Sequence, residues 1–217
     1  MMNINTEDYI KAVHKLEREG EKVTTSALAE ELQLADASIT DMVKKLSEKG
    51  LLIYAPYKGV GLTAKGRRMA LKIVRRHRLW EMFLVKFLGF SWDQVHEEAE
   101  RLEHVMSDEL ERRLDEALGH PSVDPHGDPI PAADGSFEPA AYRALTDYNV
   151  GDVVRVLRVS DEDSGILQHA SRLGLHLNKR LTVRDKMSFD GSIVIKLGSK
   201  EHFLSREVAS AIFAEPA

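Results

Sequence analysis

Histidine and glutamate recur at short intervals in the segment HEEAERLEHVMSDE, residues 96–109. His96, Glu100, Glu103 and His104 follow one another at spacings of four, three and one positions. On an α-helix, residues three or four positions apart lie on one face, so two imidazoles and two carboxylates would line one stripe. Neutral imidazole and ionised carboxylate are good ligands for divalent metals. The spacing therefore predicts a metal-binding stripe on a helix.

A second pair of the same kind lies upstream, where RRHRLWE places His77 and Glu81 four positions apart. Two antiparallel helices that present His and Glu toward each other would form a cage for a divalent cation. The alternative is a charged helix surface that forms ion pairs and binds no metal.

The chain contains no cysteine, which excludes disulfides, thiolate metal sites and thiol nucleophiles. An oxygen-rich cage suits manganese(II), and a mixed nitrogen and oxygen cage also suits iron(II). Zinc, cobalt, nickel or cadmium would also bind such a cage in vitro, because raw affinity does not set selectivity.

The first predicted element along the chain is a helix over residues 6–19. A short helix capped by Thr24 or Thr25 and a third helix over residues 37–50 follow, and together they predict a helix-turn-helix. The segment LLIYAPYKGVGLTAKG has strand-like ends around a turn at Pro56 and Gly59, which is typical of a wing. A winged fold also occurs as a protein-interaction module.

The rest of the chain changes its periodicity twice. Helical patterns at Ala64–Leu88 and 91–118 carry apolar stripes that would form a core or a dimer interface. Residues 119–140 are rich in Pro, Gly and Asp and predict a linker. Short strand patterns then occupy 149–161, 180–187, 191–198 and 201–214, with one helix near Ser164–Leu173.

The expected fold class is mainly α with a small β part. Residues 1–72 would form a winged helix-turn-helix DNA-binding domain, and residues 73–140 a helical metal-binding and dimerisation domain with the linker. Residues 141–217 would form an SH3-like (FeoA-like) β-barrel.

Charge is distributed unevenly along the chain. The net charge is +3 over residues 1–75, −9 over 76–140 and +1 over 141–217. From Lys44 to Arg78, eleven basic residues accompany a single acid, Glu48. This basic stretch predicts an anionic partner, unless it is only a solvated surface. The sequence shows no secretory signal and no apolar run long enough to cross a bilayer, so we expect a cytoplasmic protein.

Five segments together resemble the family of diphtheria toxin repressors and manganese transport regulators. They are TEDYIKAV, TTSALAEELQLADASITDMVKKLSEKGLL, RRHRLWE, VHEEAERLEHVMSDELERRLDEALGHP and HGDPIP. The resemblance is close over residues 1–131 and looser in the barrel. It implies a homodimeric, metal-activated repressor that binds double-stranded operator DNA and controls genes of metal uptake.

The resemblance implies a primary metal site made of Asp8, Glu100, Glu103 and His104, with His77 nearby. Iron-responsive members place Met at the position of Asp8 and Cys at that of Glu100. Because this chain has carboxylates at both positions, manganese(II) is favoured and iron(II) is the alternative. Binuclear manganese members have an acid where this chain has Lys11, so a bridged metal pair is not expected.

An ancillary site is also implied, for which the candidates by position are His77, Glu81 and His96. Longer manganese-responsive members combine a Glu at the position of Glu81 with linker ligands that match Asp124 and His126. They add an Asp from the barrel, for which Asp163 (or Asp161) is the candidate.

One metal held by Asp8 and by the later ligands would tie the DNA-binding domain to the dimerisation domain. It would hold the two recognition helices of a dimer at the spacing of successive major grooves. The residues placed to approach base edges are Ala37, Ser38, Thr40 and Asp41. The residues suited to phosphates are Lys44, Lys45, Lys58, Thr25 and Ser26.

Two other classes of protein compete with this interpretation. A metalloenzyme would need an open coordination position and a substrate cleft, and the sequence shows no nucleophile motif, so no enzyme activity is expected. A winged-helix regulator with a protein or organic effector would leave the His and Glu stripe as ordinary surface.

Overall fold

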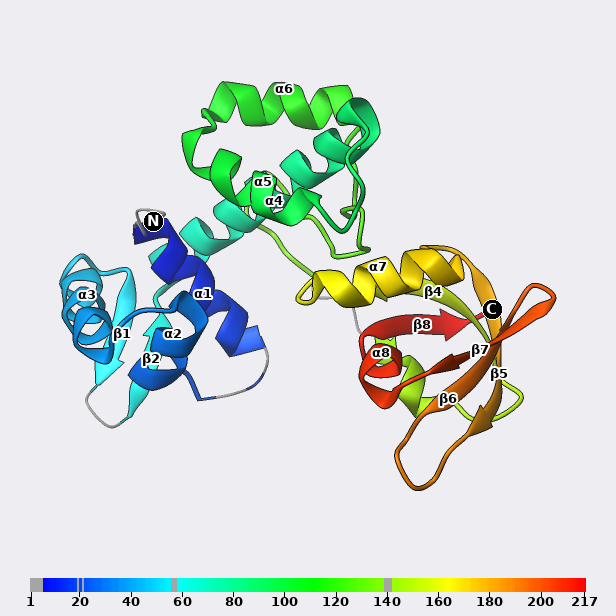
Figure 1. Ribbon diagram of the computed structural model, residues 1–217. Coiled ribbons are helices and arrows are strands. Elements are labelled where there is room, and N and C mark those ends of the chain that lie inside the picture. Colours follow the sequence, from blue (N-terminus) through cyan, green and yellow to red (C-terminus); the bar gives the residue numbers. More distant parts are fainter. Residues whose placement is uncertain (1–5, 19, 21, 56–57, 139–141) are drawn as a thin grey trace. The chain divides into compact units, whose positions relative to one another are not determined.

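The computed structural model describes residues 6–18, 20, 22–55, 58–138 and 142–217 (Figure 1). The chain divides into two compact units. The first consists of Met1–His77, Glu103–Met106 and Pro131–Phe137, and the second of Arg78–Leu102, Ser107–Ile130 and Glu138–Ala217.

The first unit contains the predicted winged helix-turn-helix. It comprises α1 (Thr6–Arg18), α2 (Thr25–Leu32), α3 (Asp36–Glu48), β1 (Leu52–Ala55), β2 (Gly59–Leu62) and the start of α4 (Ala64–Leu88). The Thr24 hydroxyl caps α2 by accepting a hydrogen bond from the Ala27 amide at 3.1 Å. Apolar faces of the three helices and of the antiparallel wing share one core. Pro56, expected in the wing turn, lies outside the described residues.

The expected single helix over residues 91–118 is wrong in one respect. The chain forms α5 (Val95–Leu102), a 3-10 turn η1 (Glu103–Val105) and α6 (Asp108–Leu118). The helix is interrupted because Ser107 adopts an extended backbone and its hydroxyl accepts a hydrogen bond from the Leu110 amide, which starts a new helix. As a result, Glu103 and His104 lie in a tight 3-10 turn and not in the continuous α-helix that the periodicity predicted.

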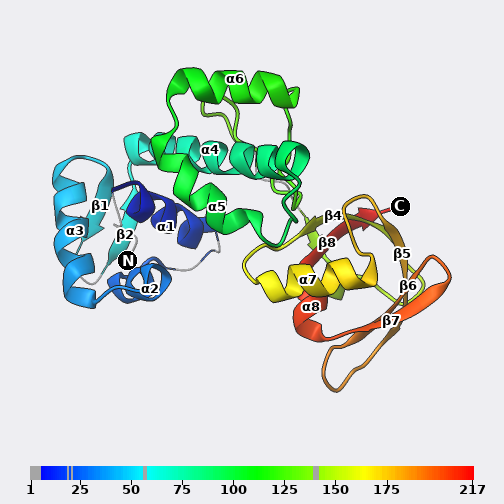
Figure 2. The ribbon, with the colours of Figure 1, turned by 45° about the horizontal axis from the view of Figure 1, so that its top comes forward.

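The C-terminal part of the second unit is the predicted small β-barrel (Figure 2). Its strands are β3 (Arg143–Ala144), β4 (Val153–Val159), β5 (Arg180–Lys186), β6 (Ile193–Leu197), β7 (Lys200–Leu204) and β8 (Ile212–Pro216). They form one antiparallel sheet in the order β3-β8-β4-β5-β6-β7. A 3-10 turn η2 (Leu145–Asp147) follows β3, and α7 (Ser164–Leu173) follows β4. Segment 201–214 contains the helix α8 (Arg206–Ser210), which the strand pattern had hidden.

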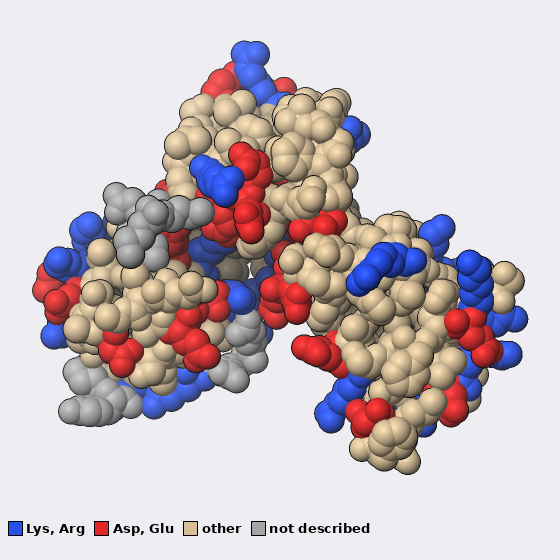
Figure 3. Space-filling view, viewed as in Figure 1, with Lys and Arg blue, Asp and Glu red and all other residues tan. Residues whose placement is uncertain are grey.

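Both acidic and basic side chains lie on the barrel face seen in Figure 3, in separate groups among other residues. This mixture agrees with the small net charge of residues 141–217. Among the described helices, none is long and apolar enough to cross a membrane.

The linker loop at residues 122–130 is closed on itself and attached to β4. Val123 and Pro129 form an isolated β-bridge, and the Val159 amide donates to the His126 carbonyl at 2.9 Å. Gly127 adopts φ +96°, and a Cβ there would lie 2.0 Å from the Leu157 carbonyl oxygen. The loop can approach β4 this closely only because residue 127 has no side chain.

We therefore expect Gly127→Ala to lower the free energy of unfolding by about 3 kcal/mol or more, because φ strain and a backbone clash add together. Gly135→Ala is the matched control, since Gly135 has φ +81° but no atom within 4 Å of an added Cβ. The control should cost about 1–2 kcal/mol, the strain alone. Denaturant unfolding of both variants measures the difference, and equal losses would contradict the close approach.

Candidate metal centres and nucleic-acid interface

The first unit brings a histidine of the 3-10 turn η1 against the acidic first turn of α1. The ring atom Nε2 of His104 lies 2.9 Å from Asp8 Oδ1 and 3.6 Å from Glu103 Oε1. Its other nitrogen, Nδ1, lies 2.7 Å from Glu7 Oε2. One imidazole nitrogen and two carboxylate oxygens therefore converge on one point, which is a donor set that a divalent cation accepts.

Glu103 is fully buried, and the positive charge of Lys11 neutralises its carboxylate. The Lys11 ammonium donates to Glu103 Oε1 at 3.0 Å and to Oε2 at 2.8 Å. His77 Nδ1 lies 2.6 Å from Glu103 Oε2 and 3.2 Å from the Lys11 ammonium. Lys11 therefore places a positive charge beside the two residues that the resemblance puts at or near the primary site.

Glu100, expected as a primary ligand, belongs to the second unit. It lies on α5, and its Oε1 is 3.7 Å from Nε2 of His96, one helical turn earlier.

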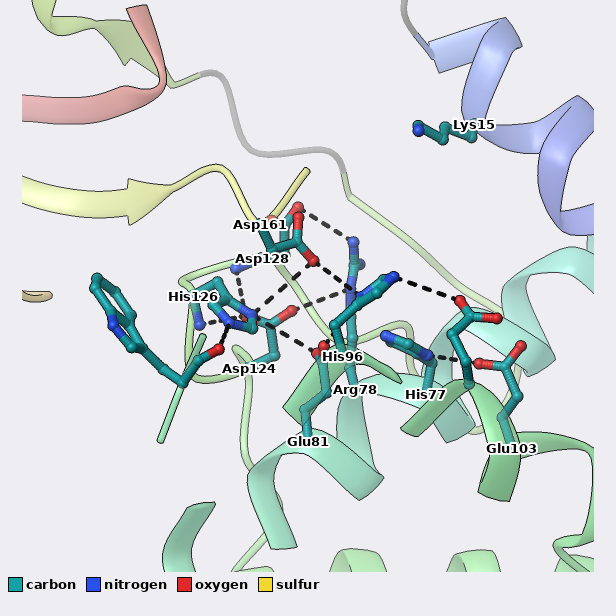
Figure 4. Close-up of polar contacts among 12 residues, drawn as sticks. Lys15, His77, Arg78, Glu81, His96, Glu103, Asp124, His126, Asp128 and Asp161 are labelled. Atoms are coloured by element: carbon teal, nitrogen blue, oxygen red, sulfur yellow. Dashed lines mark hydrogen bonds and ion pairs between the residues drawn. The ribbon is translucent and has the colours of Figure 1, made fainter. Parts of the chain in front are cut away.

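The second unit gathers a larger set of candidate ligands around the linker loop (Figure 4). Glu81 comes from α4, His96 from α5, Asp124 and His126 from the loop, and Asp161 from the segment after β4. Glu81, Asp124 and His126 each offer an atom within 4.8 Å of the others, and Glu81, His96 and Asp161 do the same.

The possible ligand atoms of this cluster lie near one another but outside hydrogen-bonding distance. His96 Nδ1 lies 3.6 Å from Glu81 Oε1 and 3.7 Å from Asp161 Oδ2. His126 Nδ1 lies 3.8 Å from Glu81 Oε2, 3.9 Å from Asp124 Oδ1 and 4.0 Å from Asp161 Oδ2. These separations are too long for hydrogen bonds. Neighbouring ligands that each lie about 2.0–2.3 Å from one metal ion are about 2.8–3.8 Å apart, so these atoms would have to move only slightly closer together to surround one ion.

His126 provides an independent observation that fits a metal. Its Nε2 lies 2.7 Å from the Trp92 carbonyl oxygen, which can only accept, so the proton of a neutral ring belongs on Nε2. The fully buried Nδ1 then carries a lone pair, and it has no hydrogen-bond partner among the described residues. A backbone carbonyl that fixes the tautomer of the opposite nitrogen is a common arrangement for metal-binding histidines.

Asp163, expected as the barrel ligand, has a different role in the structure. Its side chain caps α7 and accepts a hydrogen bond from the Gly165 amide at 2.7 Å. Asp161, the alternative, is the residue that contributes to the cluster. Helix capping by Asp163 was readable from its position just before a helical pattern.

Sequence reasoning named Asp124 only as a possible metal ligand and missed three residues that hold the linker loop, Arg78, Asp128 and Arg158. Asp124 Oδ1 accepts hydrogen bonds from the amides of His126 and Asp128 at 2.8 and 2.9 Å. Arg78 contacts Asp124 Oδ2 at 3.3 Å and Asp128 Oδ1 at 3.1 Å, and Arg158 donates to Asp128 Oδ2 at 2.6 Å. This ladder of ion pairs joins α4, the loop and β4, and the sequence carries no signal for it because the partners are far apart in the chain.

Charge and burial shift the pKa values of two loop residues. Burial raises the pKa of Asp124 to about 7, and the neighbouring Glu81 carboxylate adds to the rise, although Arg78 opposes it. Burial alone would lower the pKa of His126, but the carboxylates of Glu81, Asp124 and Asp161 raise it overall. Both groups therefore hold protons more tightly than they would in an unfolded chain.

The expected DNA contacts lie on α2, α3 and the wing. Ala37, Ser38 and Asp41 are exposed on α3, and Thr40 is half-buried with its hydroxyl donating to the Asp36 carbonyl at 3.0 Å. The four residues exposed at the positions expected to meet phosphates are Ser26, Lys44, Lys45 and Lys58, while Thr25 is half-buried.

Three family models match the chain in succession. Residues 1–60 match the N-terminal DNA-binding domain of iron-dependent repressors, and residues 63–132 match their metal-binding and dimerisation domain. Residues 143–216 match the FeoA domain.

Individual relatives cover almost the whole chain. The iron-dependent repressor IdeR of Mycobacterium leprae is 34% identical over 97% of this chain and 96% of its own. A solved manganese-dependent transcriptional repressor in complex with manganese is 40% identical, with a TM-score of 0.90 over 97% of this chain and 99% of its own. The manganese regulator SloR is 33% identical, with a TM-score of 0.81 over 100% of both chains.

The raised pKa values predict how the metal-free protein responds to pH. Because the folded state binds these protons more tightly, its free energy of unfolding falls as the pH rises between the ordinary Asp value of 3.8 and about 7. Loss of the His126 proton at higher pH acts in the same direction. In chelator, Asp124→Asn should flatten this decline by on the order of 2–4 kcal/mol, measured by urea unfolding from pH 5 to 8. Parallel pH profiles for the variant and the original chain would contradict the assignment.

Proposed function

Because the chain belongs to the iron-dependent repressor family, we propose that it is a manganese(II)-activated repressor that binds operator DNA as a homodimer and controls genes of metal uptake. The proposed regulatory site contains Asp8, Glu103 and His104, together with Glu100, which the family resemblance assigns to the same site. A bound metal would supply the positive charge that holds these ligands together.

The chemistry of the ligand sets supports manganese. Every candidate ligand is a carboxylate or an imidazole, and the chain has no cysteine. Oxygen-rich sites suit manganese, whereas sulfur ligands favour softer metals. Asp124 in the linker loop is also an oxygen ligand of the kind that manganese prefers. Solved relatives described as manganese-dependent add to this support.

Iron(II) remains the second candidate, and a specific observation favours it. The IdeR relative, similar over almost its full length, is described as iron-dependent. Mixed imidazole and carboxylate sites also bind iron(II). The metalloenzyme alternative is not supported, since the relatives and neighbours are DNA-binding repressors.

In this function the residues of the chain have distinct tasks. Asp8 and His104 come from different elements of one unit, so a cation between them ties α1 to the 3-10 turn η1. Fixing α1 fixes the DNA-binding unit, because α1 packs in the same core as α2 and α3. Metal would therefore favour the DNA-competent state of the dimer, and DNA would tighten metal binding in return.

A linker-loop site made of Glu81, Asp124, His126 and Asp161, with His96 beside it, is the second proposed metal site. Its ligands come from α4, α5, the loop and the segment after β4, so metal there would hold the loop against these elements.

The decisive experiment measures binding of the protein to fragments of its own genome at fixed salt. We expect one class of fragment to bind about 5–150-fold more tightly with manganese(II) than with chelator. Asp8→Ala should abolish this gain but leave folding and dimerisation intact, whereas Asp185→Ala, an exposed acid of β5, should behave like the original chain. Specific DNA binding of equal affinity with manganese(II) and with chelator would refute the proposal. Anaerobic iron(II) at buffered free concentrations then decides between the two metals.

Lys11 leads to a prediction about metal count. Because its ammonium neutralises Glu103, we expect one metal at the regulatory site, and Lys11→Glu should allow one more metal per subunit. Manganese(II) binding by isothermal titration gives the count, and an exchange-coupled paramagnetic resonance spectrum identifies a neighbouring pair. Lys22→Glu, at an exposed lysine of the same unit, is the control. An unchanged count in Lys11→Glu would show that Lys11 does not limit the site.

A further inference from the structure

Residues 131–137 form a compact turn that belongs to the DNA-binding unit. The Ala132 amide donates to the Ser136 carbonyl at 3.0 Å, and the Gly135 amide donates to the Ala132 carbonyl at 3.0 Å. The Ser136 amide also donates to Asp134 Oδ1 at 2.8 Å. These bonds close the turn on itself, so the segment has a defined shape and presents the residues at its two ends.

Its first end is anchored on α4. The Arg75 guanidinium, which is 6% exposed, donates through Nη1 to the Pro131 carbonyl at 2.8 Å. Pro131 is itself buried. A hydrogen bond from a buried charged donor is among the stronger kinds in proteins, so this end of the turn is held firmly.

Its second end contacts α1 through Phe137. The Phe137 ring meets the His14 ring edge to face, with centroids 6.5 Å apart and planes at 72°. The Arg18 guanidinium lies over the same ring, 5.5 Å from its centroid. His14 and Arg18 are four positions apart on α1 and so share one face. His14 is only 4% exposed, in a position that Phe137 helps to cover.

The helix that Phe137 contacts also carries the metal ligand Asp8. Asp8 lies in the first turn of α1, and His14 and Arg18 lie in its second half. A 13-residue helix behaves as a short rod, so a contact on its second half restrains the direction of its first turn. The direction of the first turn of α1 decides whether Asp8 lies close enough to contact His104, as it does here at 2.9 Å.

We propose that Phe137 is a positioning residue, which docks the 131–137 turn on α1 and so holds Asp8 where the regulatory metal needs it. The turn begins five residues after His126 in the chain. This inference rests on the proposed function, since it assigns Phe137 a role in metal response.

The test compares Phe137→Ala, Phe137→Leu and Phe137→Tyr with the control Phe189→Ala. Phe189 lies in the β5–β6 turn and is 85% exposed, so it is the same substitution at a residue with little burial to lose. Each protein is titrated with manganese(II) in the presence of the operator fragment, and free metal is read from the paramagnetic resonance signal of the aqueous ion.

Phe137→Ala and Phe137→Leu should raise the free manganese needed for half-maximal DNA binding by about 3- to 10-fold, the size expected for one aromatic pair and one cation–π contact. DNA affinity at saturating metal should stay unchanged. Phe137→Tyr should restore the response because it keeps the ring, and Phe189→Ala should match the original chain. No shift in metal response, or an equal loss of affinity at saturating metal, would overturn the positioning role.

Amide hydrogen exchange of α1 separates this inference from the proposed function. If the original chain binds DNA without responding to metal, the proposed function fails, but Phe137→Ala should still speed exchange in α1 while Phe189→Ala does not. Equal exchange in both variants would show that the turn does not restrain α1, and the inference would be refuted.

Discussion

The structure depends on how it stabilises three carboxylates that have almost no access to water. They are Glu81, Glu103 and Asp124. An ionised carboxylate in a protein interior is costly unless cations or hydrogen-bond donors surround it. The chain meets this requirement in a different way at each residue.

Glu103 has an internal cation, because the Lys11 ammonium donates to both of its oxygens. Asp124 has an internal set of donors, two backbone amides and the side chain of Arg78. Glu81 faces His96 and His126 at 3.6 and 3.8 Å, beyond hydrogen-bonding distance. Glu81, His96 and Asp161 each offer a ligand atom within 4.8 Å of the others, so this position is a candidate metal site of the second unit.

The linker is as important to this arrangement as the helices. Its first half forms a loop fixed by Asp124, Gly127 and Asp128, and its second half forms the turn that ends at Phe137. Two glycines of the linker serve this ordered structure, because Gly127 permits a close approach to β4 and Gly135 adopts a positive φ in the turn. A regulator of this family contains a DNA-binding domain and a dimerisation domain, and the segment between elements is where the ligands of one candidate metal site are assembled.

Much of this protein was determined by local sequence. Helical and strand periodicity located the winged helix-turn-helix, the long helix α4 and the barrel strands, because these patterns depend on neighbours within one element. The spacing of His and Glu predicted residues that could bind metal, and the sequence offered Thr24 or Thr25 as the cap of α2, between which the structure decided for Thr24.

The tertiary structure decided what depends on residues far apart in the chain. The break at Ser107 turned an expected helical stripe into a helix and a 3-10 turn, because a local cap outweighed continued periodicity. Asp161, and not Asp163, reached the ligand cluster, because Asp163 was committed to capping α7. The Arg78–Asp128–Arg158 ladder and the Phe137 contact with α1 were invisible in the sequence, because a single chain of letters carries no record of which distant side chains meet.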